Sequence, residues 1–175
     1  MRGTSFNIAA FAIIEYMETE QATEKIEQGA IQFAKARKLA VVSTVSPEGI
    51  PESAMVLYYM DEKFNLFFIT RGDSRKVKNL ATNKNISVVI GTDLGPSTLQ
   101  MSGTVEIVSR DEQKNFIEKL SQDTTLGALY YGPFLEIIGI NFTLYKAKMN
   151  WVRWLTLDLN RLKEVYYQIL PKDRA

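Results

Sequence analysis

Hydroxyl and cationic side chains gather in one short segment, residues 70–78, which reads TRGDSRKVK. The pattern predicts that a strand ends at Thr70, that a glycine turn follows, and that a helix begins near Ser74. Arg75 and Lys76 then lie in the first helical turn, where cations oppose the helix dipole unless an anion is close. Free amides, a bidentate arginine and a lysine charge suffice to bind a phosphate. The segment is therefore either a phosphate clamp or a solvated basic helix face, and spacing alone favours neither.

Two further stretches could line a ligand. Residues 53–59, which read SAMVLYY, form a predicted strand whose backbone could bind a flat polar heterocycle, although core packing explains the same residues. Gln100, Ser102 and Thr104 form a polar row on one face of another strand. That row is either a ligand wall or a solvent face.

A pair of tryptophans lies on a late strand. Alternation places Trp151 and Arg153 on one face and Trp154 on the other. Such side chains could cover an aromatic ring or form a subunit interface, because Trp and Arg are favoured in such contacts. Simple core packing is the alternative.

The elements that must position these residues follow from periodicity and turn signals. A helix is expected over 19–38, a hairpin over 39–46 and 52–60, a strand over 66–70, a helix over 74–83, a strand over 86–92, a strand over 99–107, a helix over 111–120, and two strands over 141–158 that meet near Asn150. Residues beyond 160 fit strand or helix equally. The alternation in 99–107 predicts one face made of Leu99, Met101, Gly103, Val105 and Ile107.

Six or seven consecutive strands with two or three helices predict a mainly β fold, an antiparallel barrel with helices outside it, rather than a doubly wound sheet. Residues 17–160 are expected to form one domain, with residues 1–16 as an N-terminal extension and residues 161–175 as a C-terminal tail.

Composition narrows the chemistry. The 175 residues contain no cysteine and no histidine, which excludes thiolate nucleophiles, imidazole bases and the usual zinc and haem ligands. A formal charge of +1 argues against nucleic-acid binding. The apolar run at residues 6–14 is too short to span a membrane. These features predict a cytoplasmic protein without nucleic-acid or membrane partners.

Two stretches together resemble the pyridoxamine 5'-phosphate oxidase-like family of flavin-binding split barrels, especially its general stress protein branch. They read KLAVVSTVSPEGIPESAMVLYYMDEKFNLFFITRGDSRKVKNLATNKNISVVI and LQMSGTVEIVSRDEQ. The resemblance covers roughly residues 24 to 158 by motif order, and Thr-x-x-x-Ser-Arg-Lys at residues 70–76 is its most specific part.

This resemblance implies a split β-barrel that forms a homodimer and holds FMN at the subunit interface. Ser74, Arg75 and Lys76 would bind the flavin phosphate. The isoalloxazine ring would be lined by Met55, Val56 and Leu57, with Ile69 and Thr70 beside them, and a further polar contact would come from Gln100 or Thr98. Trp151 would come from the partner subunit.

The sequence departs from the family pattern at two points. The family's C-terminal Arg-x-His element, which grips the vitamin substrate, is missing because the chain has no histidine. The same absence disfavours haem-handling relatives that depend on histidine. Ala54 stands where the family has a basic residue, which would either weaken phosphate binding or leave that role to Arg71.

Three functions fit these observations. The first is an FMN-dependent oxidoreductase that acts on an unidentified small molecule, with the flavin supplying the redox chemistry. The second is a non-catalytic flavin-binding or stress-related module. The third is a reductase of the same fold that uses a deazaflavin. Authentic pyridoxamine phosphate oxidase activity is not expected.

Overall fold

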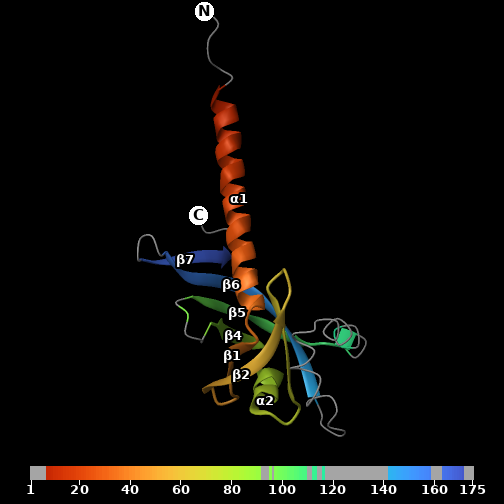
Figure 1. Ribbon diagram of the computed structural model, residues 1–175. Coiled ribbons are helices and arrows are strands. Elements are labelled where there is room, and N and C mark those ends of the chain that lie inside the picture. Colours follow the sequence, from red (N-terminus) through yellow and green to blue (C-terminus); the bar gives the residue numbers. More distant parts are fainter. Residues whose placement is uncertain are drawn as a thin grey trace, which may run out of the picture.

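Seven strands make up one antiparallel sheet in the computed structural model, in the order β3-β2-β1-β4-β5-β6-β7. β3 also pairs with β6, so six strands close into a barrel and β7 extends the sheet beyond β6 (Figure 1). The structure describes residues 7–91, 95, 97–109, 112–113, 116, 142–158 and 163–171, and at residues 7–20, 158 and 163 the backbone alone. The elements are α1 (Asn7–Lys35), β1 (Leu39–Val45), β2 (Pro51–Met60), β3 (Asn65–Arg71), α2 (Arg75–Thr82), β4 (Asn85–Ile90), β5 (Thr98–Ile107), β6 (Phe142–Asp158) and β7 (Lys163–Leu170). The predicted antiparallel split barrel with helices outside it is confirmed.

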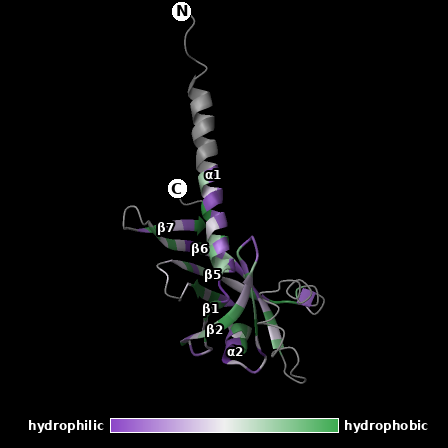
Figure 2. Ribbon diagram, in the orientation of Figure 1, coloured by the Kyte–Doolittle hydropathy of each residue, from purple (hydrophilic) through white to green (hydrophobic). Residues whose placement is uncertain are grey.

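The barrel interior is filled by one side of every strand. Hydrophobic residues recur along the strands (Figure 2), and alternate residues point inward, because successive side chains of a strand face opposite sides. Val42, Leu66, Val88 and Met101 are almost fully buried from four different strands. Phe68 stacks on Tyr145, with ring centroids 5.4 Å apart, across the β3–β6 pairing that closes the barrel. The outer side of the same strands is left for other partners.

Two helices cap the barrel, and Figure 1 shows α1 rising from one end and α2 at the other. At the first end, Ala30 and Ala34 of α1 are fully buried, and the Tyr58 hydroxyl donates to the Ala34 carbonyl at 2.6 Å. At the other end, α2 buries Asn79 and Leu80 against the barrel. Each helix therefore meets a different end of β2. Of the described residues, no helix is long and apolar enough to cross a membrane.

The predictions for the first helix, for residues 111–120 and for the C-terminal residues have different outcomes. The helix expected from residue 19 begins at Asn7, because the sequence from 7 to 18 holds no glycine or proline and includes several good helix formers. The helix predicted over 111–120 lies mostly outside the described residues, of which 112–113 and 116 are helical. The ambiguous stretch beyond residue 160 contains a strand, β7, which pairs with the end of β6. The expected boundaries at residues 17 and 160 remain predictions.

The two strands predicted over 141–158 are one continuous strand, β6, so that prediction was wrong. The irregularity near Asn150 is real, since the β5–β6 register passes from Ser102–Trp151 to Gly103–Met149 and leaves Asn150 without a partner. A Cβ on Gly103 would lie 2.0 Å from the Lys148 carbonyl oxygen, so the close approach at this bulge requires glycine.

The face predicted for β5 fails at its last residue. Ile107 is 66% exposed, whereas the next residue, Val108, is buried. The alternation of β5 continues past the bulge, since Gly103 and Val105 are both buried, so the strand leaves the core only after Val105, a point that regular alternation could not predict.

Candidate functional site

The α2 end of the barrel gathers the hydroxyls of the predicted clamp. Thr70 is buried at the end of β3, and its Oγ1 lies 3.1 Å from Oγ of Ser74. Ser74 is the N-cap residue of α2, as expected, but its side chain makes no capping hydrogen bond. A hydroxyl normally satisfies a free amide at this position. Here both hydroxyls are instead directed at each other beside the start of the helix.

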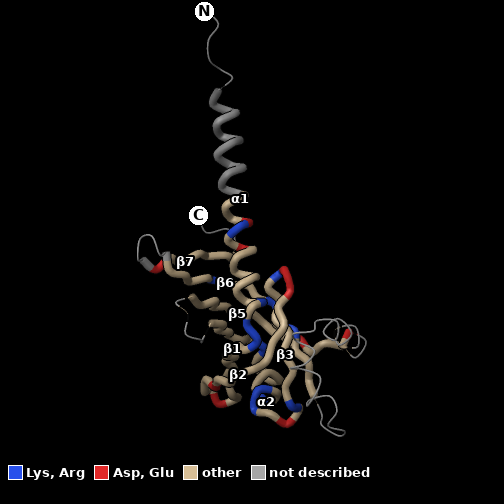
Figure 3. Tube along the Cα trace, viewed as in Figure 1, with Lys and Arg blue, Asp and Glu red and all other residues tan. Residues whose placement is uncertain are grey.

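Lys76 is the clamp cation that lacks an acidic partner. Its half-buried side chain forms no ion pair with any carboxylate among the described residues. Burial, and secondly the charge of Arg75, lower the pKa of Lys76, because both disfavour the charged ammonium. Figure 3 shows the Lys and Arg residues of α2 at this end. An anion bound here would offset both costs.

The two arginines of the segment are already paired. Arg71 Nη2 lies 2.7 Å from Asp73 Oδ2, and this hydrogen-bonded pair raises the pKa of Arg71 and lowers that of Asp73. Arg75 Nη1 donates to Glu52 Oε1 at 2.8 Å. An anion that binds either arginine must compete with a carboxylate.

A buried polar network supports Glu52. Asn79 Nδ2 donates to Glu52 Oε2 at 3.0 Å and to Thr44 Oγ1 at 2.9 Å. Thr44 and Asn79 are 1% and 3% exposed. Sequence reasoning missed these three residues. Strand alternation alone could have found Glu52, because it places this side chain on the same inward side of β2 as Ala54 and the buried Val56.

The residues expected to line the ring, here called the platform, lie along β2 and at the end of β3. Met55 is 58% exposed, and Leu57 is partly buried on the same side. Ile69 of β3 lies in the same outer cluster. Val56 is buried and points into the barrel, so only its backbone could meet a ligand on this side. The platform and the clamp adjoin through β2 and β3.

Gln100 and Trp151 lie elsewhere on the outer surface. The register runs from Met55 through Val41 and Val89 to Gln100, which is three strands away, or roughly 14 Å at the usual strand spacing. Trp151 lies on β6 opposite Ser102, beyond the segment Phe142–Lys148 that pairs with β3. One chain therefore brings Thr70, Ser74, Arg75 and Lys76 together but does not bring Gln100 or Trp151 to them.

The outer side of β6 carries an aromatic and cationic group. The guanidinium of Arg153 lies 5.2 Å from the Trp151 ring centroid and 5.9 Å from that of Tyr166. Trp154 faces the other side and packs on Phe33 of α1, as alternation predicted. Thr98 Oγ1 is buried without a hydrogen-bond partner among the described residues. That unsatisfied hydroxyl makes Thr98 a candidate for the further polar contact that the sequence left between Thr98 and Gln100.

Comparison with known proteins identifies the family. The family model described as pyridoxamine 5'-phosphate oxidase matches residues 26–153, which is most of the chain. The chain belongs to this family. The pyridoxine/pyridoxamine 5'-phosphate oxidase of Streptomyces avermitilis is 29% identical over 122 residues, which cover 63% of this chain and 54% of the relative. The chain thus spans about half the length of that relative.

Several solved structures share the fold at low sequence identity. A pyridoxamine 5'-phosphate oxidase-related, FMN binding protein from Nostoc punctiforme is 18% identical with a TM-score of 0.56, covering 82% of this chain and 96% of that one. A protein related to general stress protein 26 from Clostridium acetobutylicum is 21% identical with a TM-score of 0.60, covering 83% and 96%. A heme binding protein from Mycobacterium smegmatis is 17% identical with a TM-score of 0.60, covering 81% and 57%. The predicted resemblance to the family is confirmed by the family model, and the neighbour related to general stress protein 26 shares the fold.

Proposed function

We propose that this protein of the pyridoxamine 5'-phosphate oxidase family binds FMN with the flavin phosphate at the α2 end of the barrel. The observation that carries the proposal is Lys76, a half-buried cation without a carboxylate partner among the described residues, at the start of α2 and close in the chain to the buried Thr70. A phosphate there would take charge-assisted bonds from Lys76 and neutral bonds from the Thr70 and Ser74 hydroxyls. These donor types fit a phosphate monoester.

The isoalloxazine ring would lie over the outer side of β2. Met55 and Leu57 offer an apolar surface there, and Ile69 borders it on β3. The backbone of residues 55–57 would supply polar contacts to the ring edge, with Val56 taking part through its backbone alone. The ring platform is thus mostly apolar, as is usual for cofactor sites.

A second copy of the chain would complete the site. Thr98 and Gln100 of β5 lie three strands from the platform, roughly 14 Å at the usual strand spacing, and Trp151 lies beyond the part of β6 that pairs with β3, so these residues would reach a flavin from a partner. Leu39, Met55 and Tyr166 are large hydrophobic side chains that are exposed on the outer surface of the sheet. A homodimer that pairs these surfaces would bury them and place the cofactor at the interface.

FMN would supply the electron and hydride transfer. The side chains of this chain would hold and orient the cofactor, since the sequence offers no histidine or cysteine to exchange protons near neutral pH. We propose an oxidoreductase acting on a small molecule other than pyridoxamine phosphate, because the substrate-gripping histidine expected from the resemblance is missing. The cysteine-free composition keeps the cytoplasm as the proposed location.

The test is an anaerobic reduction of FMN-loaded protein. The protein is incubated with FMN, desalted, and mixed with NADH and then NADPH, while the flavin absorbance is followed. Bleaching of the bound flavin supports the oxidoreductase. A flavin that stays bound and oxidised with both donors contradicts the activity and favours the non-catalytic module. Failure to retain FMN, with retention of a deazaflavin or haem instead, contradicts the cofactor.

A further inference from the structure

Glu52 places a negative charge inside the proposed phosphate site. It stands near the start of β2, paired in register with Thr44, and its side chain points toward α2. Its Oε1 accepts from Arg75 at 2.8 Å. The guanidinium of Arg75, which a phosphate would bind, is therefore already paired with the Glu52 carboxylate.

The geometry fixes the carboxylate more firmly than the arginine. Glu52 Oε2 accepts from Asn79, which is itself buried and bonded to buried Thr44. The Glu52 side chain is 22% exposed, whereas that of Arg75 is 79% exposed. Arg75 can swing away into solvent, but Glu52 cannot leave without breaking the Asn79 hydrogen bond.

The neighbouring charges do not compensate for this carboxylate. Ala54, two residues along the same side of β2, carries no charge, and Arg71 is paired with Asp73. Lys76 is left as the one clamp cation without a carboxylate partner among the described residues. A dianionic phosphate beside Lys76 would gain its attraction and meet repulsion from Glu52.

We propose that Glu52 is a specificity-determining residue that weakens binding of a terminal phosphate and so narrows the preference for FMN over riboflavin. The inference rests on the proposed flavin site. Riboflavin ends in a hydroxyl, which neither repels the carboxylate nor requires the Arg75–Glu52 pair to open. The wild-type protein is therefore expected to bind FMN and riboflavin with similar affinities. A site in which Arg75 and Lys76 were both free of carboxylates would favour FMN more strongly.

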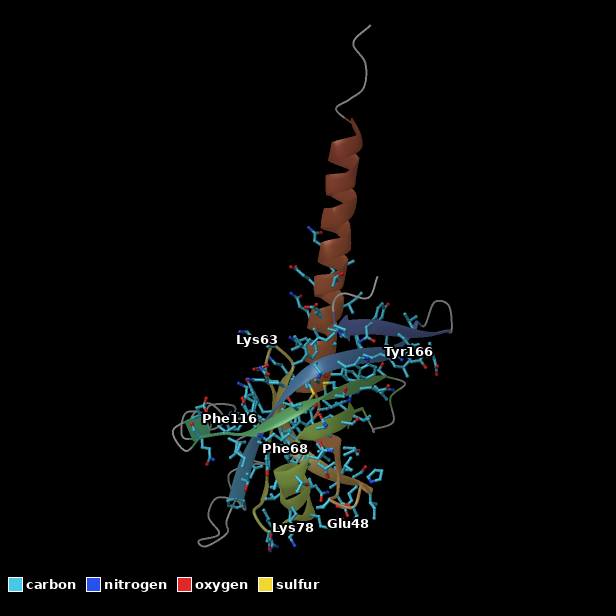
Figure 4. The ribbon with its side chains drawn as sticks, turned by 180° about the vertical axis from the view of Figure 1, so that it is seen from behind. Glu48, Lys63, Phe68, Lys78, Phe116 and Tyr166 are labelled. Carbon is cyan, nitrogen blue, oxygen red and sulfur yellow. The ribbon has the colours of Figure 1, made fainter. Side chains whose placement is uncertain are left out.

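The experiment measures the dissociation constants of FMN and riboflavin by quenching of flavin fluorescence, for the wild type and for Glu52→Gln. Glutamine keeps the shape and can still accept from Asn79, so the variant is expected to fold. A matched control is Glu48→Gln, at the same end of the molecule as Lys78 of α2 in Figure 4. Glu48 bonds to Ser46 in the β1–β2 turn and not to the clamp.

Glu52→Gln is expected to tighten FMN by about tenfold or more, as removal of a nearby like charge predicts, and to change riboflavin less than about twofold. Glu48→Gln should leave both constants unchanged. The preference is the ratio of the riboflavin and FMN dissociation constants of one variant, so a general loss of folded protein affects both constants and cancels. Glu52→Ser is a second variant in which the same ratio is measured. An unchanged or smaller FMN preference in both Glu52 variants overturns the inference and shows that Glu52 positions Arg75 for the phosphate. If no variant binds either flavin, the proposed function itself is wrong.

Discussion

The two ends of the barrel are each closed by a helix, but by opposite kinds of contact. At the α1 end, aromatic and small apolar residues pack together, with Tyr58 under Ala34 and Phe33 against Trp154. At the α2 end, Asn79 crosslinks buried Thr44 to Glu52. β2 takes part in both contacts, through Tyr58 at the α1 end and Glu52 at the α2 end.

This difference separates structural residues from functional ones. Burying polar groups costs free energy unless every group finds a partner, whereas apolar packing closes a barrel without that cost. The α2 end buries polar groups despite this free-energy cost. It also holds the half-buried Lys76, which has no carboxylate partner among the described residues. We therefore expect variants at the α1 end to change stability and variants at the α2 end to change ligand binding.

The largest effect is expected at the α1 end. Tyr58→Ala should lower the free energy of unfolding by about 3 to 5 kcal/mol, because it leaves a cavity under α1 and removes the hydroxyl that donates to the Ala34 carbonyl, which keeps its bond from the Arg37 N–H. Urea unfolding followed by circular dichroism measures this. Tyr166→Ala is the control, and this exposed tyrosine should cost less than about 1 kcal/mol. Equal losses in the two variants would contradict a packed α1 end.

The double variant Arg75→Ala with Lys76→Ala should weaken FMN binding by about 3 kcal/mol, roughly a hundredfold. Each charge-assisted phosphate contact is worth about 1.5 to 3 kcal/mol, and the lower end applies because Arg75 must give up Glu52. Isothermal titration calorimetry measures the affinity. Stability should hardly change, since surface charges contribute little. Unchanged FMN affinity would remove the clamp from the account.

Asn79→Ala should lower the free energy of unfolding by about 1 to 3 kcal/mol, because it leaves Thr44 and the inner oxygen of Glu52 without their donor. Thermal unfolding of the ligand-free protein measures the loss. Thr82→Ala, which removes one exposed hydroxyl from the same helix, serves as the comparison. If both variants lose the same small amount of stability, the buried network does not stabilise the α2 end.

The smallest effect concerns pH. The lowered pKa of Lys76 means that the unfolded chain holds this proton to higher pH than the folded chain. The lysine charge therefore destabilises the ligand-free protein at neutral pH, and stability is regained as pH rises toward the ordinary lysine value of 10.5. Lys76→Met should melt slightly higher than wild type at pH 7, with the gap closing by the alkaline end. A lower melting temperature for Lys76→Met at pH 7, relative to Lys78→Met, would show that the ammonium has a partner.

Much of this architecture can be predicted from the sequence because it depends on residues that are close together in the chain. Alternation and the turn at Pro47 predict the β1–β2 hairpin, and the order Thr70, Ser74, Arg75, Lys76 predicts the strand, turn and helix of the clamp. The family resemblance rests on the same local motifs.

The parts that sequence reasoning missed depend on distant partners. Glu52 meets Arg75 across 23 residues, and Thr44 meets Asn79 across 35. The continuity of β6 follows from its pairing with β3 on one side and β7 on the other, which no local pattern reveals. The exposure of Ile107 shows that β5 leaves the core after Val105, which the alternating pattern of residues 99–107 does not reveal.

The most direct measurement is an absorbance spectrum of the protein purified from cells grown with riboflavin, and again after incubation with FMN and desalting. The account predicts that the bands of oxidised flavin stay with the wild-type protein and are lost from the Arg75→Ala, Lys76→Ala variant. A wild-type protein that keeps no flavin band after desalting would contradict a flavin site at the α2 end, and the fold would stand without it.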